Sequence, residues 1–228
     1  MYGKLPLELW IKITNYTQEL GLLLTNKNFF ELLYLVNFET NIIEYVVENN
    51  LLDILRYIIF LKKINHPIIT ENVIDIRCLE KYLNTSCKNG KLEIVKHLVD
   101  MGANIFHNKN CAIMLASEYG HLEIVKYLVS KGCDVRADND YAVIYASKNG
   151  HIEIVKYLVS KGCDVRSCNS YAVRLASIHG HLEVVKFLVK KGANYRALNH
   201  HAVIEASKNG HYDIVGFLLN YPTRTTKQ

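Results

Sequence analysis

The chain of 228 residues has no uninterrupted apolar run that approaches the roughly 18 residues needed to cross a membrane. Its first residues, MYGKLPLELWIKI, also lack an apolar stretch that leads to a small-residue cleavage site. We therefore expect an intracellular protein without a membrane anchor. Hydrophobic residues make up 50% of the chain, which argues against a disordered or fibrous protein and favours a folded one with a sizeable core.

Motifs of common catalytic sites are missing as well. The sequence contains no Gly-rich phosphate loop, no Ser nucleophile elbow and no H-E-x-x-H pattern. A catalytic site would need a cluster of chemically active residues that stands out from its surroundings, and none does. We expect no enzymatic activity, no catalytic residue and no cofactor.

What the sequence does contain is a repeat of thirty residues. Each copy has a glycine, preceded by Asn, Tyr or His and followed by a near-identical apolar run; these dipeptides are Asn89-Gly90, Tyr119-Gly120, Asn149-Gly150, His179-Gly180 and Asn209-Gly210. A strict repeat of this length indicates a small unit stacked in a row, in which each copy buries its apolar face against its neighbours. Such a stack offers an extended surface, which favours binding over catalysis.

Each unit reads as two helices and a turn. In the copy 135–164, residues 141–149 and 151–161 are predicted to be helical, with Gly150 between them. The second helix carries an amphipathic apolar stripe that includes Leu158. Equivalent helices are expected at 91–101, 121–131, 181–191 and 211–220. Their Glu and Lys residues, spaced i, i+3, should form ion pairs on the outer face.

The six cysteines do not suggest disulfides or a metal site. Cys133 and Cys163 occupy the same slot in successive copies, and stacked helices lie about 8 to 10 Å apart, whereas a disulfide needs Cα atoms within about 7 Å. The remaining cysteines show no C-x-x-C spacing, so we predict that they are buried small residues; they are Cys78, Cys87, Cys111 and Cys168.

Four histidines also recur once per copy: His121, His151, His181 and His211. Because they are equivalent positions, they should be separated by the spacing of the stack. A zinc ion requires all its ligands within about 2.1 Å. We therefore predict that these histidines belong to turns and that the chain has no metal site.

The second half of each copy resembles the ankyrin repeat, as in Gly120-His121, Glu123-Ile124-Val125 and Leu128-Val129. The first half departs from the family, because Tyr141-Ala142-Val143-Ile144 stands in place of T-P-L-H and three residues are missing from the turn. The resemblance implies an all-α ankyrin-type helical solenoid with shortened projecting turns. Five repeats are expected, at 75–104, 105–134, 135–164, 165–194 and 195–221, with a tail at 222–228 and a degenerate repeat plus insertion at 36–74.

Residues 1–35 do not follow the repeat. They contain Leu5-Pro6-Leu7-Glu8-Leu9 and Ile13, which resembles the opening of an F-box. The resemblance implies binding to the adaptor subunit of a cullin-based ubiquitin ligase through Leu5, Pro6, Leu9, Ile13 and Tyr16. A short helical module that only caps the first repeat would explain the same apolar residues, and this alternative stays open.

Residues that vary within the constant frame are candidates for partner recognition. In the ankyrin family such positions line the concave face and the turns, which bind other proteins. The resemblance therefore implies a partner-binding set of nine residues: Phe106, Tyr119, Arg136, Lys148, Arg166, Arg174, His179, Arg196 and Lys208.

The positive charge is concentrated towards the carboxyl end. The copy 165–194 has five Lys or Arg residues against one Glu, whereas the copies 105–134 and 135–164 are balanced. Arg136, Arg166 and Arg196 recur once per copy. Single-stranded nucleic acid would require such a basic track together with exposed aromatic residues. However, four aspartates offset the first two of these arginines: Asp134, Asp138, Asp140 and Asp164. We favour an acidic protein partner over nucleic acid.

The sequence as a whole predicts protein–protein recognition, with the F-box-like segment recruiting a ligase and the repeats holding its target. The alternatives are a structural or sequestering scaffold without a ligase and, with less support, a nucleic-acid binder that uses residues 165–228. The near-consensus repeats in an Asn-, Ile- and Tyr-rich chain resemble the ankyrin proteins of large DNA viruses, which would imply the host cytoplasm as the location.

Overall fold

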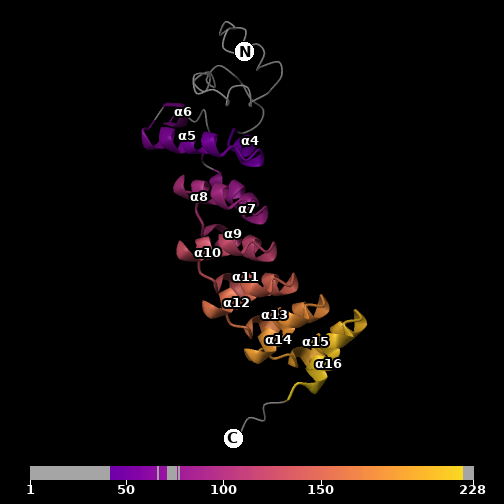
Figure 1. Cartoon of the computed structure of the whole chain (residues 1–228). Coiled ribbons are helices and arrows are strands. Elements are labelled where there is room, and N and C mark those ends of the chain that lie inside the picture. The colour runs from indigo at the N-terminus through magenta and orange to yellow at the C-terminus, as the bar shows by residue number, and fades with distance from the viewer. Residues whose placement is uncertain (1–41, 66, 71–75, 77, 223–228) are drawn as a thin grey trace. The chain divides into compact units, whose positions relative to one another are not determined.

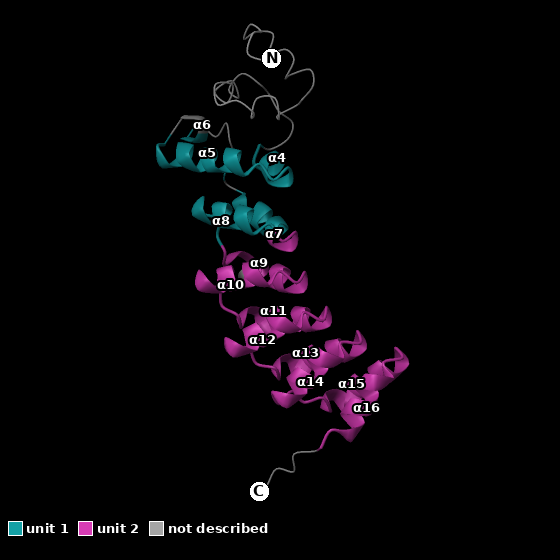
Figure 2. Ribbon diagram, viewed as in Figure 1, with its two compact units in different colours: residues 1–86, 91–104 teal, residues 87–90, 105–228 magenta. Residues whose placement is uncertain are grey.

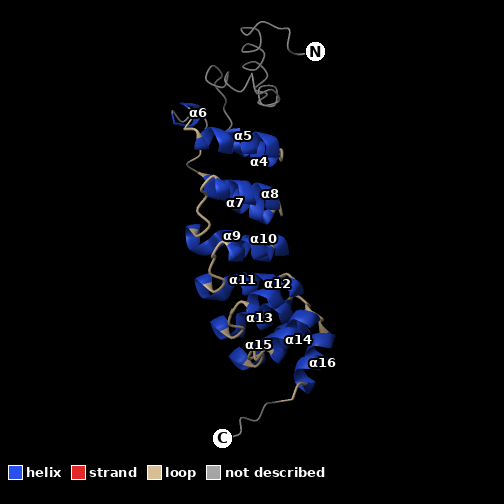
Figure 3. Cartoon of the chain, turned by 60° about the vertical axis from the view of Figure 1, so that its left-hand side comes forward, coloured by secondary structure: helices blue, strands red, loops and turns tan. Residues whose placement is uncertain are grey.

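The computed structural model describes residues 42–65, 67–70, 76 and 78–222. Within these residues every regular element is a helix, and no strand occurs (Figure 3). None of the described helices is both long and apolar enough to cross a membrane. The all-helical class predicted from the sequence is therefore confirmed for this part of the chain.

The chain divides into two compact units (Figure 2). Unit 1 comprises residues 1–86 and 91–104, and unit 2 comprises residues 87–90 and 105–228. The described helices of unit 1 are α4 (Ile42–Glu48), α5 (Leu52–Lys63), α6 (Pro67–Thr70), most of α7 (Leu79–Lys88) and α8 (Leu92–Asp100).

In unit 1, helix α5 contacts α4, α6 and α8. Ile43, Leu55 and Ile58 are completely buried between these helices. The turn between α4 and α5 holds Asn50 at a φ of 56°, in the position where the later copies have glycine. Asparagine tolerates the left-handed region better than most residues, which explains how the chain turns here without glycine.

The described residues of unit 2 contain four helix pairs. The first helices of the pairs are α9 (His107–Glu118), α11 (Ala137–Lys148), α13 (Ser167–Ile178) and α15 (Ala197–Lys208). The second helices are α10 (Leu122–Ser130), α12 (Ile152–Ser160), α14 (Leu182–Lys190) and α16 (Tyr212–Asn220). Each first helix contacts the next first helix and each second helix the next second helix, so the pairs stack in two layers (Figure 1).

The second helices agree with the sequence pattern to within one residue at each end. Leu128 and Leu158, which the apolar stripe places in the core, are completely buried. On the outer face, the ammonium nitrogen of Lys126 lies 2.7 Å from a carboxylate oxygen of Glu123. The same distance between Lys156 and Glu153 is 2.8 Å. The predicted ion pairs are confirmed, and their exposure makes each one worth only a few tenths of a kcal/mol.

The projecting turns have an unusual backbone conformation, at the place where three residues are missing relative to the ankyrin pattern. These turns are residues 105–110, 135–140, 165–170 and 195–200. In three of them, three consecutive residues before the right-handed helix adopt positive φ: 138–140, 168–170 and 198–200. A left-handed turn costs roughly 1–2 kcal/mol per non-glycine residue. In these three first helices the right-handed part therefore begins directly after the left-handed residues, at Tyr141, Tyr171 and His201.

Successive repeats are also joined by hydrogen bonds from a buried polar residue at the end of two projecting turns, Asp140 and Ser170. Asp140 is 2% exposed, and its carboxylate accepts a hydrogen bond from the backbone N–H of Asp164 at 2.9 Å. It also accepts one from the hydroxyl of Ser167. One repeat later, Ser170 accepts the backbone N–H of Asn194 at 2.8 Å. These hydrogen bonds compensate for the free-energy cost of burying polar groups between repeats.

The cysteines only partly follow the prediction. All six are free, and Cys87, Cys133 and Cys163 are buried, but Cys78 and Cys168 are exposed. The prediction of burial was wrong for these two, and Cys111 is only half-buried. Cys168 is exposed because it lies in the left-handed part of a projecting turn. Burial, together with the negative charge of Asp140, raises the pKa of Cys163 to about 12, so this thiol stays protonated and unreactive.

Candidate functional site

The first helices of unit 2 leave one stripe uncovered. In α11, Tyr141, Tyr145 and Lys148 are half-buried, while the residues at 142–144 and 146–147 are buried. The spacing i, i+4, i+7 places these three side chains on one side of the helix. We call this surface the first-helix face; it comprises Cys111, Leu115, Glu118, Tyr141, Tyr145, Lys148, Tyr171, Arg174, Leu175, Ile178, His201, Glu205 and Lys208.

The centre of the first-helix face is aromatic and apolar. Tyr141 and Tyr145 pack edge to face with ring centroids 5.8 Å apart, and Leu115 and Leu175 occupy the position of Tyr145 in the neighbouring repeats. On α13, the guanidinium of Arg174 lies 5.1 Å from the ring centroid of Tyr171. Tyrosines that are partly buried combine a large apolar area with a polar tip, which is typical of binding surfaces.

One edge of this face lies at the carboxyl ends of the first helices. Here Tyr119 is 44% exposed, and the ammonium of Lys88 lies 5.1 Å from its ring centroid. A shallow pocket next to it is lined by Glu118, Tyr119, Asn149 and His151. The exposed ring of His179 stacks on the ring of His181, with the ring centroids 6.5 Å apart. The Nζ of Lys208 lies 2.7 Å from the Oε1 of Glu205.

The opposite edge is formed by the projecting turns. Phe106 is 54% exposed there, and Arg136 approaches the carboxylate of Asp140 at 3.6 Å. The Nε of Arg166 donates to the carbonyl of Gly192 at 3.0 Å, while the guanidinium of Arg196 lies 5.3 Å from the ring centroid of Tyr195. All three arginines are exposed.

Eight of the nine predicted partner-binding residues thus form two rows, and Arg174 lies between them within α13. Phe106 and the arginines of the turns lie at the amino ends of the first helices, and Tyr119, Lys148, His179 and Lys208 lie at the carboxyl ends. The right-handed part of each helix is about 12 Å long at 1.5 Å per residue. The half-buried Tyr141, Tyr145 and Tyr171 fill the space between the rows. Sequence analysis missed these tyrosines, although their i, i+4 spacing carries the signal.

The arginines of unit 2 differ in whether a carboxylate lies close enough to form an ion pair with them. Arg136 has a carboxylate within ion-pair distance. Among the described residues, no such carboxylate accompanies Arg166, Arg174 or Arg196, whose contacts are to a carbonyl or an aromatic ring. The charge of these three guanidinium groups is therefore not neutralised by a neighbouring carboxylate of the described residues.

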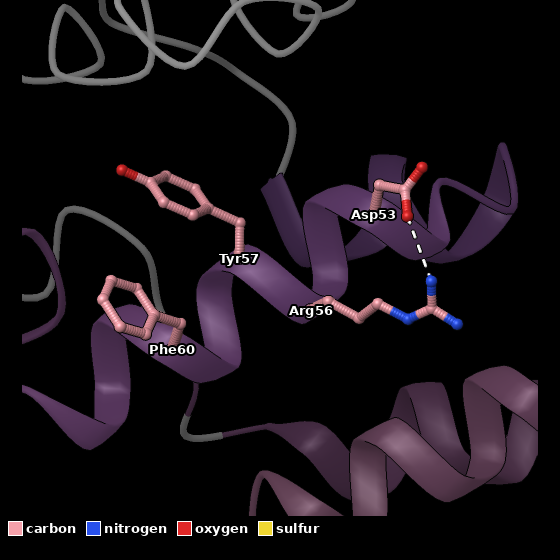
Figure 4. Close-up of a pocket in the computed structure, with 4 residues that line it drawn as sticks. All are labelled: Asp53, Arg56, Tyr57 and Phe60. Atoms are coloured by element: carbon pink, nitrogen blue, oxygen red, sulfur yellow. Dashed lines mark hydrogen bonds and ion pairs between the residues drawn. The ribbon is translucent and has the colours of Figure 1, made fainter.

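Unit 1 has a separate surface feature on α5. Figure 4 shows Tyr57 and Phe60 on one side of the helix and the pair of Asp53 and Arg56, 3.1 Å apart, on another. The two aromatic rings stack at 6.2 Å, and Phe60 is 53% exposed. The later second helices carry a polar residue in the position of Phe60, such as Ser130.

Two further sequence predictions concern the adaptor-binding residues and the absence of a metal site. The candidate adaptor-binding residues lie outside the described residues: Leu5, Pro6, Leu9, Ile13 and Tyr16. Within the described part of the chain, no group of three or more His, Cys, Asp or Glu side chains is placed so that it could hold a metal ion.

Stacked helix pairs with a glycine turn between them, a repeated turn histidine and projecting turns define the ankyrin class of repeat protein. The family model described as "Ankyrin repeats (3 copies)" matches residues 42–139, 83–169 and 143–228. The chain belongs to the ankyrin repeat family.

Its relatives include viral proteins. Ankyrin repeat protein L45 of Acanthamoeba polyphaga mimivirus is 86% identical over 119 residues, which cover 52% of this chain and 52% of that protein. Ankyrin repeat proteins R873 and R844 of the same virus are 50% and 47% identical over 119 and 118 residues. These matches cover 52% of this chain and 25% and 55% of the two relatives. The similarity therefore extends over about half of the chain and about half or less of each relative.

Proposed function

We propose that this chain is a protein-recognition module without catalytic activity, and that its first-helix face and projecting turns hold one partner protein. The observation that carries this proposal is the stripe of half-buried tyrosine and leucine side chains along α9, α11 and α13. Such a stripe provides apolar area for a partner, and the polar rows on both sides provide orientation. Membership of the ankyrin family supports the same function.

The partner that fits this surface is an acidic segment with apolar side chains. Its apolar residues would cover Tyr141, Tyr145 and Tyr171, and its carboxylates would face Arg166 and Arg196. Exposed charges of this kind mainly accelerate association, and salt screens them over about 8 Å at physiological ionic strength. Association should therefore slow as the salt concentration rises.

Charge reversal on two opposite surfaces tests the proposal. Affinity purification from amoeba lysate, followed by mass spectrometry, would identify the partner. The variant Arg166→Glu, Arg174→Glu, Arg196→Glu should lose it. The control variant Lys126→Glu, Lys156→Glu, Lys186→Glu changes the net charge equally on the second helices and should retain it. Equal responses of both variants would reject the first-helix face as the binding surface.

Because Arg174 is half-buried, its replacement could disturb the fold. A second variant, Arg166→Glu with Arg196→Glu, changes only exposed side chains and should still weaken binding at low salt. Circular dichroism of each variant shows whether the helices are retained.

Recruitment of a ubiquitin-ligase adaptor is a second proposal, and only the F-box-like sequence of residues 1–35 supports it. Replacing Leu5 and Pro6 by Ala should abolish capture of the adaptor and leave the helical signal of the repeats unchanged. Loss of both together would favour the capping alternative. Retention of adaptor binding would reject the assigned residues. A scaffold without any ligase would capture a target but no adaptor.

A further inference from the structure

Glu118, at the carboxyl end of α9, differs from the other glutamates of unit 2. Each of the others forms an ion pair with the lysine three residues later; they are Glu123, Glu153, Glu183 and Glu205. Three residues after Glu118 the chain has His121 instead, and the Nε2 of His121 lies 2.9 Å from the carbonyl oxygen of Lys88. Among the described residues, the half-buried carboxylate of Glu118 therefore has neither a hydrogen bond nor an ion pair.

The backbone of Glu118 is held by the next repeat. Its carbonyl accepts a hydrogen bond from the Nδ2 of Asn149 at 2.8 Å and another from the Nε2 of His151 at 3.0 Å. Asn209, in the same position of a later copy, donates instead to the carbonyl of Glu205 in its own helix. The bond from Asn149 thus joins two helix pairs, and the side chain of Glu118 takes no part in either bond.

The pocket that these residues line together with Tyr119 has a volume of about 330 Å³; we call it the Glu118 pocket. This volume is at the lower end of the range for ligand pockets, so the pocket suits one side chain. The other copies have Asn or His in the position of Tyr119, and Lys or Ile in the position of Glu118. The pairing of a carboxylate with an exposed tyrosine ring therefore belongs to this repeat alone.

The ring of Tyr119 already has a cation beside it. The ammonium of the exposed Lys88 lies 5.1 Å from the ring centroid, which is a favourable distance for a positive charge. Lys88 reaches the ring but forms no ion pair with Glu118. The planar guanidinium of an arginine stacks on an aromatic ring and also presents paired donors to a carboxylate. An arginine from outside can therefore contact both groups, and Lys88 competes with it for the ring.

We propose that the Glu118 pocket binds an arginine side chain of the partner protein and thereby sets the direction in which the partner lies along the stack. This inference rests on the proposed function, in which carboxylates of the partner face Arg166 and Arg196. Packed helices lie about 10 Å apart, so two repeats separate the pocket on α9 from the turn before α13 by at least about 20 Å. An extended segment spans this distance with about six residues. The partner segment therefore has an arginine towards one end and carboxylates towards the other.

A peptide library tests this arrangement. Random peptides of about 16 residues, long enough to span the distance, are displayed on phage and selected on the full chain. They should yield binders in which an arginine lies about six or more residues from Asp or Glu. One binder is then synthesised with arginine and with citrulline, its neutral analogue. For the parent chain, citrulline should weaken binding about three- to tenfold, as expected for a partly exposed charged hydrogen bond. For Glu118→Gln the two peptides should bind alike.

Three further variants give matched comparisons. Glu123→Gln removes the same charge on the outer face and should leave the affinity for the arginine peptide unchanged. Tyr119→Asn introduces the residue that other copies have and should weaken binding. Lys88→Met removes the competing cation and should strengthen binding, so its effect has the opposite sign. Glu118→Gln keeps the size of the side chain and the backbone carbonyl, so circular dichroism should show the helices of the parent chain.

The outcomes separate this inference from the proposed function. Binders that lack arginine, or that Glu118→Gln does not affect, would overturn the inference alone if Arg166→Glu with Arg196→Glu still abolishes their binding. A selection that yields no binder would overturn both. Peptides that respond to Glu118→Gln but not to the reversal of the two arginines would support the Glu118 pocket and reject the acidic partner.

Discussion

The imidazole of His181 lies against the backbone of Gly150, and a Cβ at Gly150 would come within 2.5 Å of its Nδ1. The Nε2 of the same ring lies 2.9 Å from the carbonyl oxygen of Lys148. Because a carbonyl only accepts, Nε2 carries the hydrogen. The same relationship links Gly90 to His121, Gly120 to His151 and Gly180 to His211. Each histidine thus joins its own repeat to the preceding one.

Replacing Gly150 by Ala should therefore destabilise unit 2 for two reasons. The glycine has a φ of 76°, which costs roughly 1–2 kcal/mol for a residue with a side chain. The new Cβ would also displace the ring of His181 and weaken a hydrogen bond worth about 1 kcal/mol. We expect a loss of about 2 to 3 kcal/mol in the free energy of unfolding, measured by urea denaturation.

Gly210 provides the control, since its φ is 78° but nothing lies within 4 Å of an added Cβ. Gly210→Ala should show only the backbone cost, roughly 1–2 kcal/mol. Equal losses for the two variants would show that the histidine contact contributes nothing.

The sequence predicts one half of this relationship. Helix ends that turn left-handed favour glycine, and that rule identifies every glycine of the repeat without a structure. It does not reveal the contact with a ring 31 residues later, because the contact depends on how closely neighbouring repeats stack. In the same way, the apolar stripe predicts Leu158 in the core. The i, i+4 spacing of Tyr141 and Tyr145 indicates that they share one side of a helix, but only the structure shows that this side is left half-buried.

Unit 1 contains a natural variant of the glycine–histidine contact. Asn50 replaces the glycine, and Lys91 replaces the histidine. The ammonium of Lys91 donates to the carbonyls of Val47 and Glu48 at 2.9 and 3.0 Å, at the carboxyl end of α4. A cation at this end of a helix is favourable, and a slender lysine chain can pass a residue that has a Cβ.

This substitution pattern predicts compensation in unit 2. Gly150→Asn alone should destabilise the chain, because its Cβ meets the ring of His181. Adding His181→Lys should recover part of that loss, giving a coupling energy of at least about 0.5 kcal/mol in a double-mutant cycle. Urea denaturation of the two single variants and the double variant measures it. Strictly additive losses would contradict the prediction.

The buried carboxylate of Asp140 gives a second test of how the repeats are joined. Asp140→Ala removes the acceptor for the N–H of Asp164 and the hydroxyl of Ser167, which should cost about 1 to 3 kcal/mol for the groups left unpaired. Asp140→Ser should lose clearly less, because Ser170 accepts the equivalent N–H in the next repeat. Equal losses for both replacements would show that the hydrogen bond to the backbone is not what stabilises this junction.

The histidine contacts should also make stability depend on pH. Burial lowers the pKa of His181 below its ordinary value of 6.5, and the neighbouring His179, His151 and His211 act in the same direction, against the opposing effect of the hydrogen bond to Lys148. A histidine whose pKa is lower in the folded state stabilises the fold fully above its unfolded pKa, and this contribution is lost as the pH falls through the folded pKa.

Between about pH 7 and pH 5, the urea midpoint of the parent chain should fall more steeply than that of His181→Asn, whose amide can still donate to the Lys148 carbonyl. The other histidines are present in both proteins, so the difference between the two curves reports the replacement of His181. Parallel curves would show that protonation of His181 does not oppose folding.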